Sequence, residues 1–300
     1  MSSHPLQFRL EAWVARGALA LLRALGPARA SALGGAIARS IGPWLPVSRV
    51  ADINLRYCLP ELDIAARRRI IHGVWDSLGR TAAELPHAAD LELTAEGPGF
   101  EVVGREVLEA CRDAGGPVIL FSGHIACWEI LPRVLREAGM PMASFYRAAT
   151  NPAVDALIAA ERQRTSGAGV PLFAKGTKGA RAALAYLARG GRVGMLVDQK
   201  MNDGIAARLF GHPAMTAAAA ATLALRLKCP LVPGHVERLG PARLRIVVEP
   251  PLPHPASGDL HADVATLTQA MNDCLERWIR ARPQEWLWLH RRFPLDVYRG

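Results

Sequence analysis

The chain has 300 residues, of which 50% are hydrophobic and 21% are charged, so it is long enough for one large domain or two modest ones, and disorder is excluded. The formal charge of +9 favours anionic partners, which include phosphates, anionic lipid and acidic proteins. Nucleic acid is disfavoured because the sequence contains no zinc-ligand spacing, ribonucleoprotein aromatic motif or dense basic run. Widely spaced cysteines without a CxxC pair indicate reduced thiols and no metal: Cys58, Cys111, Cys127, Cys229 and Cys274.

The first predicted element is an apolar helix over residues 6–25. Arg9, Arg16 and Arg23 recur every seventh residue and line up as one basic stripe, opposite a face that carries Leu10, Trp13, Val14, Leu21 and Leu25. This pattern suits a helix that lies in the headgroup region of a membrane, because its uncharged stretches are far shorter than the roughly 20 residues of a spanning helix. A second apolar stretch over residues 30–44 extends the predicted membrane-associating segment to residues 1–46. The alternative is an amphipathic helix packed on the body of the protein.

Strands alternate with helices in the rest of the chain. Two helices are predicted over residues 51–59 and 64–85. Strands of the buried type follow over residues 117–122, 142–146, 170–173, 193–197, 231–236 and 244–248. Helices are predicted between and after them, over residues 125–138, 154–165, 177–189, 217–227 and 262–280. The alternation predicts one α/β domain over residues 47–300, with a central, mostly buried mixed sheet flanked by helices.

A histidine and a glutamate follow the strand predicted over residues 117–122, in the stretch FSGHIACWEI. On one continuous helix His124 and Glu129 would point about 140° apart. If Gly123 and His124 instead form the turn out of the strand, Glu129 can reach back to the imidazole and orient a general base. The helix amino terminus would then offer N–H groups to an oxyanion. The alternative is a capping histidine and a surface glutamate.

Other polar residues are candidates for the same site. Cys127 is either a nucleophile or a small buried residue. No GxSxG motif precedes the turn, which argues against the serine nucleophile of an ordinary hydrolase. Asp198 and Gln199 end a predicted strand, where α/β sheets place site residues, although Asp198 alternatively caps a loop. Lys175 and Lys178 flank a glycine-rich turn that opens a helix and are candidates for phosphate binding at its amino terminus. The alternative is a solvated basic loop. Thr216 is most simply the N-cap of the helix over residues 217–227.

The stretch SGHIACWEI resembles the H-x4-D/E block of the glycerolipid acyltransferase superfamily. In detail it resembles the late acyltransferases of lipid A biosynthesis, the lauroyl and myristoyl transferases. Further segments follow in the order that family shows, over most of residues 50–295: YRAATNP at 146–152, KGTKGAR at 175–181, GMLVDQKMNDGI at 194–205, LFGHPAMT at 209–216 and RPQEWLWLHRRF at 282–293.

The resemblance implies an acyltransferase in which His124 is the general base for an acceptor hydroxyl and Glu129 is its acidic partner. It implies that Arg147 binds an anionic group, and it favours substrate contacts for Asn151, Lys175, Asp198, Gln199 and Thr216. The implied donor is a thioester of acyl carrier protein or of coenzyme A, and the acceptor is a lipid A precursor at the cytoplasmic face of a bacterial inner membrane. No metal, other cofactor or covalent acyl-enzyme is required.

Two alternatives stay open on the sequence. The acceptor could be another membrane lipid, such as a phospholipid, an ornithine lipid or a phosphoinositol mannoside. The protein could also be a non-catalytic lipid-binding protein of the same fold. The amino-terminal helix departs from the family pattern, which is often drawn as membrane-spanning, because Arg16 and Arg23 interrupt it.

Overall fold

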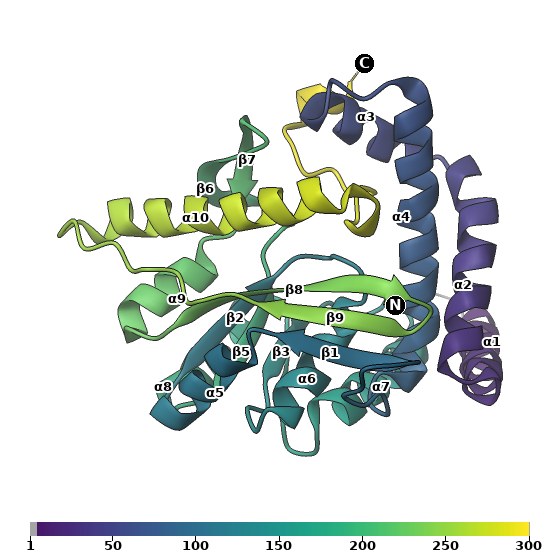
Figure 1. Ribbon diagram of the computed structural model, residues 1–300, viewed down its shortest axis with the longest axis horizontal. Coiled ribbons are helices and arrows are strands. Elements are labelled where there is room, and N and C mark those ends of the chain that lie inside the picture. Colours follow the sequence, from purple (N-terminus) through teal and green to yellow (C-terminus); the bar gives the residue numbers. More distant parts are fainter. Residues whose placement is uncertain (1–4, 300) are drawn as a thin grey trace.

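A seven-stranded mixed sheet forms the centre of the protein (Figure 1). The computed structural model describes residues 5–299, and the strands lie in the order β1-β9-β8-β2-β5-β3-β4. Strands β8 and β9 pair antiparallel, and the other neighbours pair parallel. The predicted α/β fold with a mixed sheet is confirmed. The strands are β1 (Gly99–Val103), β2 (Val118–Ser122), β3 (Ala143–Tyr146), β4 (Leu172–Ala174), β5 (Arg192–Leu196), β8 (Leu231–Gly240) and β9 (Arg243–Val248).

Helices cover both faces of this sheet. In β2, which is buried along its whole length, Val118 and Leu120 face α5 (Arg105–Ala114) and α6 (Leu131–Glu137). Phe121 points to the other face and stacks on Trp278, with 5.9 Å between the ring centroids. Burial on both faces explains why the strand reads as a continuous apolar run. The other helices around the sheet are α7 (Pro152–Ser166), α8 (Thr177–Ala188), α9 (Ala219–Leu227) and α10 (Leu260–Ala281).

The carboxyl ends of four neighbouring strands meet at one edge of the sheet. Strands β2, β5, β3 and β4 are parallel, so the residues that follow them lie along that edge. His124 follows β2, Arg147 follows β3, Lys175 follows β4 and Asp198 follows β5. The topology therefore gathers four of the predicted site residues from separate parts of the chain.

Four helices form the amino-terminal part: α1 (Pro5–Leu25), α2 (Pro27–Ile41), α3 (Ser48–Cys58) and α4 (Ile64–Glu84). Helix α4 stands across one end of the sheet, and α2 packs on its outer side (Figure 1). The two helices touch at Gly34 and Gly79, where a Cβ added to Gly34 would lie 2.4 Å from the Gly79 carbonyl oxygen. Only glycine at these positions allows so close an approach of the two backbones.

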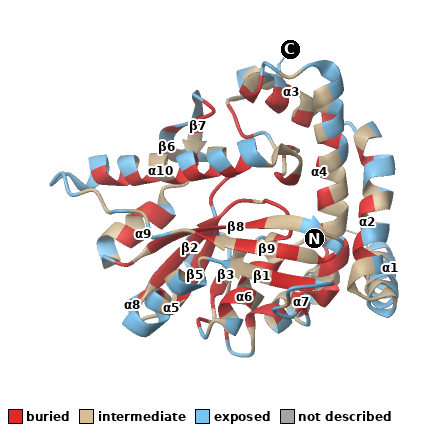
Figure 2. Ribbon diagram, viewed as in Figure 1, coloured by how far each residue is buried: buried red, intermediate tan, exposed pale blue. Residues whose placement is uncertain are grey.

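Apolar side chains cover both sides of α1 and the outer side of α2. The inner side of α1 packs on the protein through residues such as Ala12, while Trp13 on its outer side is 66% exposed. Figure 2 shows exposed residues along the outer sides of both helices. The outward apolar residues, called here the outer apolar face, are Leu6, Leu10, Trp13, Val14, Leu21, Leu33, Ile37, Ile41, Trp44, Leu45 and Val47.

The predicted helical amino-terminal extension is confirmed by α1 and α2, and residues 1–4 lie outside the described residues. The division of the chain at residue 47 stays a prediction. After α2, a short 3-10 turn, η1 (Gly42–Trp44), precedes the predicted boundary at residue 47. Within residues 5–299, no helix combines the length and the apolar character needed to cross a membrane.

The five cysteines are all buried in the core: Cys58, Cys111, Cys127, Cys229 and Cys274. None forms a disulfide, as the spacing predicts. Burial raises the pKa of the thiols, to about 11 for Cys229.

The structure contains elements that the sequence pattern does not predict. They are β1, α5 and an antiparallel hairpin of β6 (Lys200–Leu209) with β7 (His212–Thr216). Conversely, the helix predicted from Ile125 is wrong at its start. Helical structure begins with a 3-10 turn, η3 (Trp128–Ile130), and α6 starts at Leu131.

Candidate active site

Residues 123–127, called here the histidine turn, connect β2 to η3. The turn pairs with the segment that follows the 3-10 turn η4 (Pro283–Glu285), where Ile125 forms an antiparallel bridge with Trp286. The Ala126 N–H donates to the Glu285 carbonyl over 2.9 Å, and Ala126 has a φ of +47°. These long-range contacts take the backbone out of the α region, which explains why the predicted helix does not begin at Ile125.

Asp198 holds His124 with two hydrogen bonds. Its Oδ1 lies 2.8 Å from the imidazole Nδ1, and its Oδ2 accepts from the His124 backbone N–H over 2.8 Å. A third donor, the indole Nε1 of Trp286, lies 2.8 Å from Oδ2. Asp198 is fully buried at the end of β5, beside β2, so the carboxylate is fixed by the sheet. Since an ionised carboxylate only accepts, Nδ1 carries the proton and Nε2 is free to act as a base.

The charges of the pair stabilise each other. Burial alone would raise the pKa of Asp198, but the charge and the hydrogen bonds of His124 outweigh it and hold that pKa well below its ordinary value. Burial alone would lower the pKa of His124, and the Asp198 carboxylate outweighs it, so the pKa of His124 is raised. Asp198 therefore stays ionised and favours a protonated imidazole, as the partner of a general base does.

The Nε2 side of the imidazole faces polar side chains at the edge of the sheet. The Gln199 Nε2 lies 3.5 Å from the His124 Nε2. Trp128 contacts the ring edge-on, with 5.0 Å between the centroids. The positive charge of Lys175 is close enough to oppose protonation of the imidazole. Gln199 and Lys175 are both exposed, so this side of His124 is open to a substrate.

The predicted contact of Glu129 with the imidazole is wrong, because Asp198 takes that place. Glu129 instead forms a two-pronged ion pair with Arg162 of α7, whose Nε and Nη2 donate over 3.0 and 2.5 Å. The misplaced helix start explains the difference, since Glu129 lies in η3 and not one turn into a helix. Its negative charge still helps to raise the pKa of His124, after the larger influences of burial and Asp198.

Three backbone N–H groups of the histidine turn are occupied. The His124 N–H donates to Asp198, the Ile125 N–H to Gly123 and the Ala126 N–H to Glu285. These three groups are not available to an oxyanion, contrary to the prediction. The side chains of Gln199 and Lys175 are the donors that lie beside His124.

Arg147 and Lys175 are exposed cations that follow the neighbouring strands β3 and β4. The residues before them, Tyr146 and Ala174, face each other in the β3–β4 register, and the Lys175 N–H donates to the Tyr146 carbonyl over 2.9 Å. Neither side chain has a hydrogen-bond or ion-pair partner among residues 5–299. Two neighbouring cations without a counterion can attract an anionic group.

The family model described as bacterial lipid A biosynthesis acyltransferase matches residues 2–294. The chain belongs to this family. A curated relative from Haemophilus influenzae, named lipid A biosynthesis acyltransferase, is 24% identical over 244 residues, which are 80% of this chain and 73% of the relative. The chain is thus an acyltransferase of the lipid A biosynthesis family, which confirms the prediction from the ordered motifs.

In this acyltransferase, two of the predicted substrate contacts have structural partners. Asn151 is the N-cap of α7, and its amide nitrogen donates to the Phe8 carbonyl and to Glu11 of α1. Thr216 is buried at the end of β7, and its hydroxyl accepts from Asn272 and Arg292 over 3.0 and 2.7 Å. Thr216 is not the N-cap of α9, because that position is Ala218. Both side chains join elements of the acyltransferase fold.

Cys127 is fully buried, and the negative charge of Glu84 of α4 acts on its thiol. Burial raises the pKa of this thiol well above its ordinary value, so the acyltransferase holds Cys127 protonated. Of the two interpretations of this residue, the small buried side chain agrees with its environment and the nucleophile does not.

Three further side chains lie at this site and are not predicted from the sequence. Trp286 donates to Asp198, Arg162 holds Glu129, and His290 lies 3.3 Å from the Asp198 carbonyl oxygen through its Nε2. Burial lowers the pKa of His290, so this ring is favoured in its neutral form. All three reach the site through long-range contacts, and the RPQEWLWLHRRF segment was the only signal for two of them.

Proposed function

We propose that this protein transfers a fatty acyl chain from an acyl carrier protein thioester to a hydroxyl group of a lipid A precursor, with His124 as the general base. The observation that carries the proposal is the imidazole of His124, fixed through Nδ1 on the buried Asp198 and open at Nε2. Membership of the lipid A biosynthesis acyltransferase family supports the substrate class.

The proposed reaction has two steps. The Nε2 of His124 removes the proton from the acceptor hydroxyl while its oxygen attacks the thioester carbonyl carbon. The tetrahedral intermediate then collapses: its C–S bond breaks, the ester stays on the acceptor, and the leaving thiolate takes the proton from the imidazolium. Asp198 remains ionised and stabilises the imidazolium between the steps. General base catalysis of this kind contributes a factor of about 10² to 10⁴.

The oxyanion of the intermediate is proposed to lie against the side chains of Gln199 and Lys175. Both flank His124 and carry N–H donors, whereas the N–H groups of residues 124–126 are occupied. Glu129 is proposed to act through its charge, which favours the imidazolium, while Arg162 holds it in place. Glu129 is thus proposed to act on the imidazole by its charge alone, without contact.

The anionic parts of the substrates are proposed to bind Arg147 and Lys175. A guanidinium and an ammonium side by side suit a phosphate group, which a lipid A precursor and the phosphopantetheine arm of a carrier protein both provide. The formal charge of +9 also suits an acidic carrier protein as a partner.

The outer apolar face of α1, α2 and the following turn is proposed to lie on the cytoplasmic surface of a bacterial inner membrane. Helix α1 is apolar on the side that packs and on the side that faces outward, so the outward side lacks a protein partner among residues 5–299. Arg9, Arg16 and Arg29 are exposed near it and suit anionic headgroups.

The function is tested by mass spectrometry of lipid A from cells in which the gene is deleted. We expect the deletion to remove one secondary acyl chain and the wild-type gene to restore it. His124→Ala should not restore it, because Nε2 is the proposed base. His261→Ala, which changes an exposed histidine of α10, should restore it and is the matched control.

The outcomes separate the parts of the proposal. Unchanged lipid A after deletion, with an acyl chain missing from another lipid, would move the acceptor to that lipid. Restoration by His124→Ala would contradict the general-base role. Purified protein supplied with acyl carrier protein or with coenzyme A thioesters then identifies the donor, and a folded protein without transfer to any acceptor would point to lipid binding alone.

A further inference from the structure

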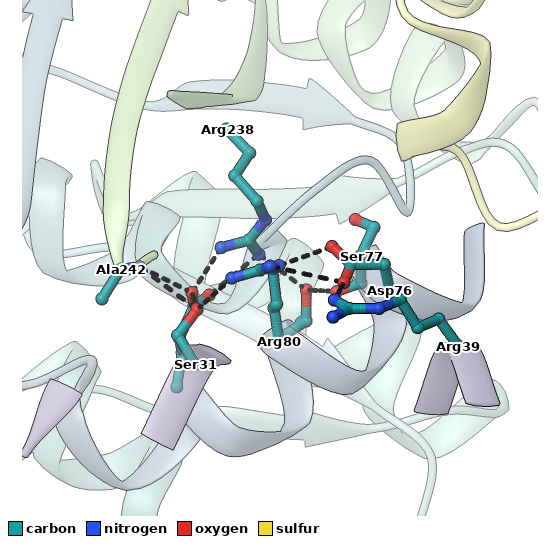
Figure 3. A network of polar contacts seen from close by, with 9 residues as sticks. Ser31, Arg39, Asp76, Ser77, Arg80, Arg238 and Ala242 are labelled. Atoms are coloured by element: carbon teal, nitrogen blue, oxygen red, sulfur yellow. Dashed lines mark hydrogen bonds and ion pairs between the residues drawn. The ribbon is translucent and has the colours of Figure 1, made fainter. Parts of the chain in front are cut away.

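A buried polar network lies behind the histidine turn and joins α2, α4 and the β8–β9 hairpin (Figure 3). Glu84 at the end of α4 is its centre and is fully buried. Ser31 of α2 donates to Glu84 Oε1 over 2.6 Å, and the Ala242 N–H donates to the same oxygen over 3.1 Å. The Arg238 guanidinium forms an ion pair with both carboxylate oxygens of Glu84, with its Nη2 2.9 Å from Oε2. The buried charges are therefore paired and hydrogen bonded.

Two contacts connect this network to the histidine turn. The Thr81 hydroxyl lies 2.8 Å from the carbonyl oxygens of both Ala126 and Ser77, which share its one proton, and Arg238 Nη2 donates to that hydroxyl over 3.3 Å. Helix α4 thus holds the turn from one side, while the Glu285 carbonyl holds the Ala126 N–H from the other.

Ala126 needs such support because its backbone is strained. Its φ of +47° lies in the left-handed region, which residues with a Cβ avoid. Strained residues persist where the surroundings over-determine them. If Ala126 relaxed, the backbone of His124 two residues earlier would move relative to Asp198.

We propose that Thr81 is a positioning residue for His124, which holds the strained Ala126 peptide through its hydroxyl and so keeps the imidazole on Asp198. This inference rests on the proposed general-base role of His124. Thr81 is 3% exposed and lies in α4, so it acts through the turn and not on the substrate.

The test replaces Thr81 by valine, which keeps the shape and removes the hydroxyl, and by serine, which restores the hydroxyl. We expect Thr81→Val to lower kcat about tenfold or more while both KM values stay within about twofold, because the base is misplaced and the binding residues are not. Thr81→Ser should keep most of the activity. The matched control is Thr165→Val, since Thr165 is also buried and bonds a carbonyl one turn earlier in α7.

A second readout does not depend on the acyltransferase assay. In an NMR pH titration, we expect the His124 resonance, identified by its loss in His124→Ala, to titrate at lower pH in Thr81→Val than in wild type. A weaker hydrogen bond to Asp198 raises the pKa of His124 less, so the lowering of that pKa by burial becomes the larger effect. If the proposed function is wrong, the wild type will be inactive in the acyltransferase assay, but the shift of the His124 titration between wild type and Thr81→Val can still be measured.

Glycine at position 126 gives a further comparison, because glycine adopts a positive φ without strain. Ala126→Gly should recover part of the kcat lost in Thr81→Val, which a general loss of stability would not allow. If Thr81→Val does not fold, Thr81→Ala replaces it in every comparison. The inference is overturned if the variant without the hydroxyl has wild-type kcat and titration, or if Thr165→Val loses as much activity.

Discussion

At the scale of single residues, the site depends on the contact between His124 and Asp198, which are 74 residues apart in the chain. The five-residue spacing predicts Glu129 in the place that Asp198 takes. Both His124 and Asp198 could be predicted as ends of buried strands, but their pairing depends on β2 and β5 being neighbours. Local spacing contains no information on strand order, which is why a carboxylate nearby in the sequence was chosen.

Asp198→Asn should lower kcat/KM by about 10² to 10⁴, since the amide can favour the wrong imidazole tautomer and does not stabilise the imidazolium. Glu129→Gln should cost clearly less, because its carboxylate makes no contact with the imidazole. Steady-state kinetics of the two variants, with folding checked by circular dichroism, measures the difference. Equal losses would mean that Glu129 touches the reacting groups.

The pH dependence follows from the raised pKa of His124. The base must be neutral, so kcat/KM should fall as the pH drops through an apparent pKa above the ordinary value of about 6.5. In Asp198→Asn, no carboxylate at position 198 opposes the effect of burial, so the pKa of His124 should be lower than in wild type. The remaining activity should therefore decline only at lower pH. A pH profile of both proteins tests this, and an acidic limb that does not move would exclude His124 as the group that titrates.

At the scale of elements, the strands and helices of the buried sheet could be predicted because their residues are apolar over whole segments. Helix α7 and strand β2 agree with the prediction to within a few residues. The β6–β7 hairpin was missed because most of β6 is not buried, so its sequence lacks the alternation of a strand. The sequence pattern predicts helix at the histidine turn because the residues that pair with the turn, 285–287, lie far away in the sequence.

The close contact of α2 and α4 leads to a prediction on stability. Gly34→Ala should destabilise the protein by about 1–3 kcal/mol, because the new Cβ would meet the Gly79 backbone. Gly17→Ala is the matched control: Gly17 lies in α1 with nothing within 4 Å of an added Cβ. Alanine there should be neutral or stabilising by up to about 1 kcal/mol. Denaturant unfolding of both variants checks the prediction, which an unaffected Gly34→Ala would contradict.

At the scale of the whole molecule, the outer apolar face and the site belong to different parts that are joined through α4. The face lies on α1, α2 and the turn after them, and α4 connects α2 to the histidine turn through Thr81 and Glu84. A protein truncated before residue 47 would therefore lose more than its outward face. Glu84 would lose the hydroxyl of Ser31, and the side of α4 that packs on α2 would be exposed.

Membrane binding is expected to depend on the two exposed tryptophans of the outer apolar face, Trp13 and Trp44, which are 66% and 86% exposed. Replacing both by serine should reduce co-sedimentation with vesicles that contain anionic lipid roughly tenfold or more, because large apolar side chains contribute about 1.5–3 kcal/mol each when buried. Leu260→Ser, at an exposed position of α10, is the control. Equal binding of all three proteins would locate the lipid contact elsewhere.

Because all five cysteines are buried and burial raises the pKa of their thiols, the native protein should react only slowly with thiol reagents. One cysteine introduced at position 44 would then be labelled selectively in the native protein, without removal of the natural ones. A polarity-sensitive dye or a spin label at that position would report directly whether the outer apolar face leaves water when vesicles are added.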